Sequence, residues 1–361
     1  MKFSINWLLV FIPITLGVEH LLHASAPVIF FCAALSIVPI AALIVRATGQ
    51  LASYTGDAVG GLLNATFGNA PELIIALVAL RAGQLEMVRA SIIGAILANL
   101  LLALGIAFLV GGIKHHDQVY NARASRTYST MMLLAAMSLA VPSAFNRYFA
   151  PGETIRQEAM LNIWIAAALL AIYVLYLVYS LKTHPESFAS AGGDQGHGHG
   201  AAGKRWSLPR ALASLVVASL LAAWMSEILV GAADGTGKAL GMSSVFIGIV
   251  FLAVVGGAAE SGSAIAMGAA NKVDLSIGIA LGSSIQIALF IAPVLVFASY
   301  FIAPAPLELS FGRAEVGSLF IGVIIGALVC GEGQSNWFKG AQLITVYLIF
   351  AAMFYFMPGV N

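Results

Sequence analysis

Two glutamates lie inside apolar segments of the chain, where a charged side chain is costly. Glu72 falls within GLLNATFGNAPELIIALVAL, residues 61–80, and Glu260 falls within FLAVVGGAAESGSAIAMG, residues 251–268. Acids at such positions face a cavity or a partner and mark ion or proton pathways. A satisfied structural acid is the alternative for either residue taken singly, and the similarity between the two segments argues against it.

The two segments form a repeat that aligns without a gap at an offset of 188 residues. The turn GQLEM at 83–87 falls on NKVDL at 271–275 in this alignment. Other aligned positions are Gly68 with Gly256, Glu72 with Glu260 and Gly94 with Gly282. Two acids at matched positions of one repeat indicate a shared function rather than two unrelated structural roles.

Two facing carboxylates have a definite chemistry. A few ångströms apart in a low dielectric, they cannot both stay ionised without a counter-charge. A divalent cation supplies that counter-charge, and protons supply it otherwise, so the two occupancies exclude each other. Mutual exclusion is the minimum requirement for exchange. If the repeat brings Glu72 and Glu260 together, the pair predicts an antiporter that exchanges a cation for protons.

Residues beside the acids predict an interrupted helix at each site. Pro71 lacks a backbone N–H and blocks a regular helical bond, which frees carbonyl groups of the preceding turn. Gly68 permits an unwound turn there, and Gly256 with Gly257 does the same in the second segment. Freed carbonyls and carboxylates form an oxygen-rich site, which suits a hard cation such as Ca²⁺. The two acids are thus the predicted metal ligands, with the metal as cargo, and no cofactor is expected.

The elements that carry these residues are predicted to be membrane-spanning helices. Of the 361 residues, 60% are hydrophobic and 9% are charged, whereas a soluble domain has roughly 25% charged residues. A spanning helix needs about 20 predominantly apolar residues. Eleven such runs occur, near 4–22, 26–46, 58–80, 87–112, 127–143, 158–182, 209–232, 242–268, 273–302, 313–331 and 338–357. The sequence therefore predicts an all-α integral membrane protein with about eleven transmembrane helices.

The third and eighth runs carry the two acids and are separated by an odd number of spans, so they cross the membrane in opposite directions. The halves are then inverted repeats, which in transporters place a site near the midplane. We divide the chain into a first helix at 1–25, a first half at 26–182, a linker at 183–208 and a second half at 209–361. The lipid bilayer is the expected partner. Assembly into a homo-oligomer is possible on the sequence alone and is not decided by it.

Charge and termini set the expected orientation. With eleven spans, the loops on the N-terminal side carry eleven of the 17 Lys and Arg residues. Positive charge concentrates on the cytoplasmic side, so the N-terminus is expected inside and the C-terminus outside, in a plasma or inner membrane. Residues 1–26 resemble a signal peptide, but Pro13 and Glu19 interrupt the apolar stretch and favour a retained helix. His197 and His199 in the linker are either solvated or bind a transition metal weakly.

The motifs around the acids resemble a known family. GNAPELIIALVAL, ASIIGAILANLLLALG at 90–105 and NKVDLSIGIALGSSIQIALF at 271–290 resemble the two alpha-repeat regions of Ca²⁺/H⁺ antiporters in the cation/proton exchanger family. The resemblance implies a peripheral first helix, two five-helix halves, and alternate binding of Ca²⁺ and protons by Glu72 and Glu260. It also implies a supporting polar shell on the following helix, here Ser283 and Gln286.

The chain departs from the family pattern around the predicted site. Gly257 replaces an asparagine, Ser261 replaces a histidine, and Ala95 and Ala98 stand where the first half often has polar partners. Two amides add to the expected polar shell, Asn69 and Asn99. The departures put cation selectivity in question, so exchange of Na⁺, K⁺ or Mn²⁺ for protons stays an alternative to Ca²⁺.

Other function classes fit the sequence less well. Glu227, inside the seventh run, is a candidate for a proton route, with a satisfied structural acid as the alternative. The inverted repeat disfavours a channel, whose repeats usually surround an axis along the membrane normal. No Gly-x-Ser-x-Gly elbow, HExxH or phosphate-binding loop occurs, so an enzyme or ATP-driven pump is not expected. The net charge of +1 and the lack of a basic tract disfavour nucleic acid as a partner.

Overall fold

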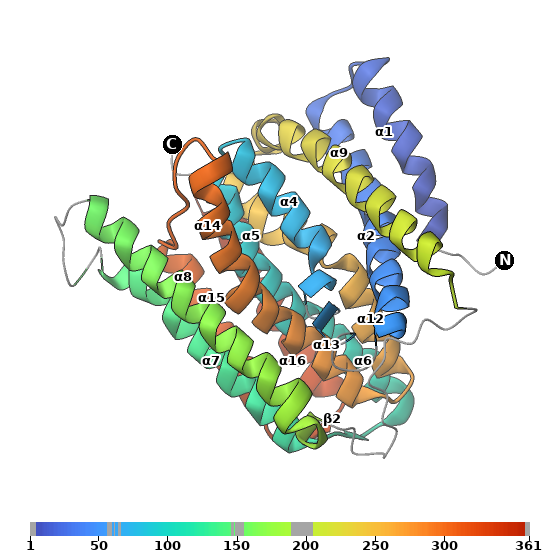
Figure 1. Ribbon diagram of the computed structural model, residues 1–361, viewed down its shortest axis with the longest axis vertical. Helices are drawn as coiled ribbons and strands as arrows, with labels where there is room; N and C mark the ends of the chain where they lie inside the picture. Colours follow the sequence, from blue (N-terminus) through green and yellow to red (C-terminus); the bar gives the residue numbers. More distant parts are fainter. Residues whose placement is uncertain are drawn as a thin grey trace.

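The computed structural model describes residues 5–55, 60, 62–63, 66–145, 148, 155–188 and 205–357, and this part is almost entirely helical (Figure 1). In chain order the elements are η1 (Ile5–Val10), α1 (Phe11–His20), α2 (Ala26–Thr55), α4 (Ala70–Arg81), α5 (Leu85–Leu97), η2 (Ala98–Ala103), α6 (Leu104–His115), β1 (Gln118–Val119), α7 (Ala122–Ala144), α8 (Ile155–Val178), η4 (Tyr179–Thr183), η5 (Pro185–Phe188), α9 (Leu208–Leu240), α10 (Ser244–Phe246), η6 (Ile247–Leu252), α11 (Ala253–Gly256), α12 (Ala258–Ala269), α13 (Val273–Gln286), η7 (Ile287–Ile291), α14 (Ala292–Ile302), α15 (Arg313–Cys330), β2 (Gln334–Ser335) and α16 (Trp337–Phe356). The two short strands pair antiparallel and are the one exception to the all-α prediction among the described residues.

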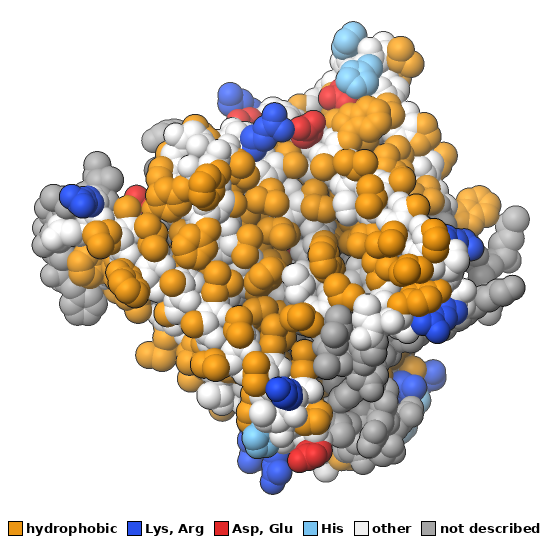
Figure 2. All heavy atoms as spheres, in the orientation of Figure 1, with side chains coloured by type: hydrophobic (Ala, Val, Ile, Leu, Met, Phe, Trp, Pro, Cys, Tyr) orange, Lys and Arg blue, Asp and Glu red, His pale blue; other side chains and the backbone are white. Residues whose placement is uncertain are grey.

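Eight helices in the described part are long and apolar enough to cross a membrane, or nine if the bent segment from Ser244 to Ala269 counts as one span. A shorter apolar helix at Trp7–His20 corresponds to the predicted first span. Figure 2 shows a broad band of hydrophobic side chains with charged side chains gathered toward its two ends. This distribution is the one expected for a protein that spans a bilayer. The chain is therefore a multi-pass membrane protein.

The longest helices, α2 and α9, lie side by side and make the most extensive helix pair of the described residues, with α1 outside them (Figure 1). The predicted ends of both helices were wrong: α2 continues to Thr55 rather than 46, and α9 to Leu240 rather than 232. The 33 residues of α9 extend about 50 Å, which exceeds the hydrocarbon thickness of about 30 Å. Helical hydrogen bonding thus continues past the apolar run, which sequence hydrophobicity alone does not register.

The repeat of 188 residues appears in the element boundaries. Helix α4 (70–81) maps onto α12 (258–269), and α5 and α13 begin at matched positions, Leu85 and Val273. The turns between them match as well, since Gly83 has φ +77° and its equivalent Asn271 has φ +61°. Asparagine is among the few residues that tolerate this left-handed conformation. The sequence alignment therefore extends to backbone conformation.

The two matched turns lie at opposite ends of the molecule (Figure 1). The α4–α5 turn approaches Pro304, in the loop after α14, whereas the α12–α13 turn contacts Gln118 and Lys114, in and beside the segment after α6. Helices α4 and α12 thus run from the middle of the molecule toward opposite ends. Of the predicted linker at 183–208, the structure describes 183–188 and 205–208, and His197 and His199 lie outside the described residues.

Candidate functional site

Both predicted acids lie in the first turn of a helix that begins in the middle of the molecule. Glu72 is the third residue of α4, after Asn69 as N-cap and Pro71 at the start of the helix, and it is 9% exposed. Glu260 is the third residue of α12, after the N-cap Gly257, where α11 and α12 meet at a 61° bend. The N-terminus of a helix carries partial positive charge, so each half-helix stabilises negative charge at its own acid.

The structure brings the two breaks together. The carboxyl groups of Glu72 and Glu260 are close enough to interact electrostatically. A Cβ atom added to Gly256 would lie 3.0 Å from Cγ of Glu72, and one added to Gly257 would lie 3.6 Å from its Oε1. The backbone at Gly257 has φ −78°, which any residue adopts. The close approach to Glu72 therefore depends on the missing side chain at Gly256 rather than on an unusual backbone conformation at Gly257.

A chain of buried polar side chains connects the two halves beside the acids. The Asn99 amide donates to the Ser283 hydroxyl at 2.9 Å, and Ser283 donates to Oδ1 of Asn69 at 2.6 Å. Asn99 lies in η2, a π-helical stretch of the kind that often occurs at functional sites. Ser283 also lies within reach of the Glu260 carboxyl. Three of the four predicted supporting residues therefore form one network, directly at the acids.

Several buried polar atoms in this cluster have no hydrogen-bond partner. Ten buried side-chain N or O atoms in the described part lack a partner, and five belong to the predicted site. They are both carboxylate oxygens of Glu72, Oε2 of Glu260, Nδ2 of Asn69 and Nε2 of Gln286. Buried polar atoms are normally paired because an unmade bond is costly. The three carboxylate oxygens among them indicate a place for a bound cation or for protons, whereas the two amide nitrogens are hydrogen-bond donors.

Two backbone carbonyls beside the acids already accept hydrogen bonds. The carbonyls of Asn69 and Gly257 accept first-turn hydrogen bonds from Leu73 and Ser261. No group of three or more His, Cys, Asp or Glu side chains placed to hold a metal ion occurs among the described residues. The side-chain oxygen atoms at this place are those of two carboxylates and of neighbouring amides and hydroxyls. This donor set suits a hard cation that keeps part of its water shell.

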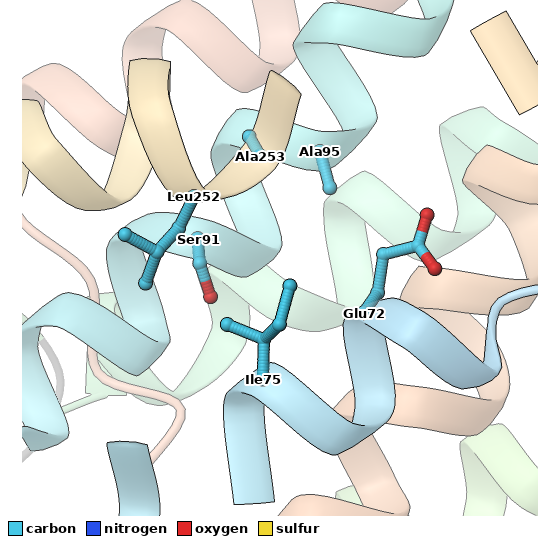
Figure 3. Close-up of a pocket in the computed structure, with 6 residues that line it drawn as sticks. All are labelled: Glu72, Ile75, Ser91, Ala95, Leu252 and Ala253. Carbon is cyan, nitrogen blue, oxygen red and sulfur yellow. The ribbon is translucent and has the colours of Figure 1, made fainter. Parts of the chain in front are cut away.

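A cavity of about 20 Å³ lies beside Glu72 (Figure 3). Its lining residues are Glu72, Ile75, Ser91, Ala95, Leu252 and Ala253. The volume is enough for about one water molecule. Figure 3 shows the Glu72 carboxylate turned away from Ser91 and Leu252, so the cavity borders the stem of the acid. Sequence reasoning missed Ser91, which lies one helical turn before Ala95 on the same face of α5.

Comparison with known proteins places this arrangement in a family. The model of the family described as sodium/calcium exchanger protein matches residues 25–182 and 210–356, which cover most of the chain and both half-helices. The chain belongs to the sodium/calcium exchanger family.

Several relatives within this family match along nearly the whole chain. A protein named Ca(2+)/H(+) antiporter from Aphanothece halophytica is 36% identical over 98% of this chain and 96% of its own length. Another, Ca(2+)/H(+) antiporter ChaA from Bacillus subtilis, is 36% identical over 94% of this chain and 95% of its own. The solved structure of native YfkE aligns with TM-score 0.83 and 33% identity over 98% of this chain and 100% of that one. A structure of the H⁺/Ca²⁺ exchanger CAX aligns with TM-score 0.68 at 14% identity, which shows a shared fold.

Two of the departures from the family pattern, Ala95 and Gly257, lie beside the cluster. Ala95 lines the cavity beside Glu72 and supplies no oxygen there. The missing side chain at Gly257 would start 3.5 Å from Oδ1 of Asn99, so the space next to that amide is where the family usually has an asparagine. Ala98 is buried at the start of η2. The first half thus supplies fewer polar groups from α5 than the second half supplies from α13.

Glu227 makes its contacts outside this cluster. It is not among the residues that line the cavity, its side chain is 60% exposed, and its carboxylate lies 3.7 Å from Arg81, the last residue of α4. Asp234, two turns further along α9, accepts a hydrogen bond from Gln84 in the α4–α5 turn. Glu227 therefore lies near the level of the end of α4, while Glu72 lies at its beginning. A role in a proton route stays a prediction.

Proposed function

We propose that this protein is a secondary transporter that exchanges Ca²⁺ for protons across a membrane. The observation that carries the proposal is the meeting of Glu72 and Glu260 at the starts of two half-helices, with most of their carboxylate oxygens unpaired. Full-length relatives at 36% identity are named Ca²⁺/H⁺ antiporters, which supports the choice of cargo. The protein is expected to act without chemical conversion of a substrate and so not as an enzyme.

The proposed exchange follows from charge balance at the pair. Ca²⁺ bound between the two carboxylates neutralises both, and its departure leaves two negative charges in a medium of low dielectric. That state is unfavourable until protons bind. Protonated carboxyl groups in turn lose their attraction for the cation. Ca²⁺ and protons therefore occupy the site by turns, with Asn69, Asn99, Ser283 and Gln286 completing the polar surroundings in either state.

Alternating access is the second part of the proposal. The matched boundaries of α4 and α12, which run toward opposite ends, support two inverted five-helix halves after a first helix, eleven spans in all. The halves differ in packing: seven residues of α4 are buried but only two of α12, Ala264 and Gly268. A Cβ at Gly94 would collide with the backbone of Ile249, whereas one at Gly282 would meet none of the described residues within 4 Å. We propose that the conformation described is closed around α4 and accessible to solution around α12. During transport the protein would change to a second conformation that is closed around α12 and accessible around α4.

Orientation is proposed from charge. The N-terminus lies in the cytoplasm and the C-terminus on the opposite side, in a plasma or inner membrane, since basic residues concentrate on the N-terminal side. The α12–α13 turn then faces the cytoplasm. Accessibility around α12 would accordingly admit cytosolic Ca²⁺, and the proton gradient would drive its export.

The decisive experiment measures proton-driven uptake of radioactive Ca²⁺ into everted vesicles. Wild type should accumulate Ca²⁺ under an imposed pH gradient, and Glu72→Gln and Glu260→Gln should each reduce uptake by at least about tenfold. Glu332→Gln, which removes an exposed acid, is the matched control and should transport normally. Gradient-driven uptake in both site variants would refute the assignment.

Cation selectivity is tested in the same vesicles, one cation at a time. Gly257, Ala95 and Ala98 remove oxygen donors that Ca²⁺ would use, so Mn²⁺, Na⁺ and K⁺ are the competing cargoes. If one of these cations causes proton release and Ca²⁺ does not, that cation is the cargo in place of Ca²⁺. The proposed exchange mechanism would be unaffected by this result.

A further inference from the structure

A basic and aromatic cluster lies where α2 ends and α9 begins. The guanidinium carbons of Arg46 in α2 and Arg210 in α9 each lie 4.9 Å from the centre of the Trp206 ring. Arg205 lies 3.9 Å from the centre of the Tyr54 ring. Trp206 itself is 8% exposed, while all three arginines are exposed. The cluster therefore presents three positive charges at one place on the molecular surface.

The cluster is built on fixed backbone contacts. The Trp206 N–H donates to Oε1 of Gln50 at 2.8 Å, the Tyr54 hydroxyl donates to the Trp206 carbonyl, and Arg205 donates to the Ser53 carbonyl at 2.6 Å. These bonds hold the segment before α9 against the last turns of α2. The arginines consequently belong to a constructed surface rather than to independent side chains.

The positive charge of this cluster has no carboxylate partner among the described residues. The ion pairs of the described part involve other residues. The N-terminus of α9 adds partial positive charge, since its N-cap Ser207 makes no side-chain capping bond. Three like charges stacked on two aromatic rings repel one another unless an anion neutralises them. The guanidinium carbons of Arg46 and Arg210, each 4.9 Å from one ring centre, are at most about 10 Å apart, and guanidinium recognises phosphate through paired hydrogen bonds.

The surroundings favour a lipid over a soluble anion. Leu35 lies about three turns from Arg46 on the same face of α2, and Val217 lies about two turns from Arg210 on the same face of α9. Both are exposed, as are Leu220 and Trp224 further along α9. Basic side chains and a long hydrophobic surface are visible along this edge of the molecule in Figure 2. A headgroup at the arginines would thus have its acyl chains on apolar surface.

We propose that the cluster of Arg46, Arg205 and Arg210 around Trp206 binds the phosphate headgroup of an anionic phospholipid. The lipid bridges the ends of α2 and α9, the two helices that pack against each other most extensively and that also contact α12 and α4. Basic pockets between transmembrane helices on a cytoplasmic surface recognise anionic headgroups in this way. The site is independent of the proposed exchange at the paired glutamates.

Native mass spectrometry of the purified full chain tests this site. Phosphatidylglycerol should bind wild type tighter than phosphatidylcholine, and Arg46→Gln/Arg210→Gln should weaken phosphatidylglycerol on the order of tenfold without changing phosphatidylcholine. Arg46→Lys/Arg210→Lys keeps the charge but not the paired hydrogen bonds of guanidinium, so it should weaken binding less than the glutamine variant does. Arg123→Gln/Lys182→Gln removes two charges near the same end of the molecule outside the cluster and should leave binding unchanged.

Two further measurements keep the test decisive. If the double glutamine variant does not fold, Arg205→Gln replaces it, since this guanidinium lies at the surface over Tyr54, and it should also weaken phosphatidylglycerol. Inorganic phosphate added in excess should not displace the lipid. Equal phosphatidylglycerol binding by wild type and the glutamine variants of the cluster would overturn the proposal. Displacement by phosphate would overturn it in favour of a soluble anion.

Discussion

Gly256→Ala tests the contact between the two half-helices most directly. The added methyl group would lie 3.0 Å from Cγ of Glu72, 3.6 Å from its Cα and 3.5 Å from Cδ1 of Ile75. A separation of 3.0 Å is several tenths of an ångström shorter than ordinary carbon–carbon contact. The contact is relieved only if the Glu72 side chain turns about its Cα–Cβ bond or the start of α4 shifts. The methyl group should therefore displace the acid from its place opposite Glu260.

The magnitude follows from the energetics of overpacking. An extra methyl group in a packed interior costs about 1–3 kcal/mol. If this cost falls on the cation-bound state alone, the affinity for Ca²⁺ falls by roughly 5–150-fold. Proton-driven Ca²⁺ uptake, measured over a range of Ca²⁺ concentrations, should then show a raised KM for Gly256→Ala.

Gly262→Ala provides the matched control. Gly262 lies six residues further along, in α12, and a methyl group there meets none of the described residues within 4 Å. Alanine in a helix interior is about 0.5–1 kcal/mol more favourable than glycine, so this variant should transport normally and unfold no more readily than wild type. A wild-type KM for Gly256→Ala, in protein that folds normally, would refute the close approach of the two halves.

Three further predictions concern packing and exposed charge. Gly94→Ala should lower the free energy of unfolding by about 1–3 kcal/mol, because its methyl group would collide with the backbone of Ile249. Gly282→Ala should not lower it, since a methyl group there meets none of the described residues within 4 Å and alanine favours a helix interior; equal losses of stability would contradict the asymmetry of the halves. Glu227→Gln and Arg81→Gln should each change stability by less than about 1 kcal/mol, as exposed ion pairs do, and loss of proton coupling in Glu227→Gln alone would assign the acid to a proton route. A hydrogen bond from Lys339 and the charge of that lysine hold the pKa of Glu332 below its usual value of 4.5. Glu332→Gln should therefore melt at a slightly lower temperature than wild type at neutral pH. The two melting temperatures should converge as the pH falls through the lowered pKa.

The repeat was the most informative feature of the sequence. Its alignment, made from letters alone, anticipated that Glu72 and Glu260 would lie at equivalent places, and the structure has both acids third in their helices. It anticipated the matched turn as well, where Gly83 and Asn271 share a left-handed conformation. Such features are local, since a proline, a glycine or an asparagine restricts the backbone at its own position.

Features that depend on packing between distant segments were not predictable in the same way. The end of α2 extends beyond its apolar run, where Gln50, Ser53 and Tyr54 form hydrogen bonds with Arg205 and Trp206 in the segment before α9. The network through Ser283 joins residues 214 and 184 positions apart, and no local pattern indicates which amide it contacts. Ser91 was missed for the same reason, since it lines the cavity only because η6 and α11 place Leu252 and Ala253 opposite it.

The structure also offers a physical account of how the site tolerates its unusual residues. Gly257 removes an amide beside Glu72, yet Asn99 places its own amide next to that space, 3.5 Å from where a Cβ at position 257 would lie. Asn99 is in a π-helical stretch, which turns its residues differently from a regular α-helix, and it bonds across the molecule to Ser283. The equivalent position in the second half is Ile287, an apolar residue. The loss of a polar group in one half is thus accompanied by a polar group from the other, so the pair of carboxylates keeps an amide neighbour even though the repeat has lost its symmetry there.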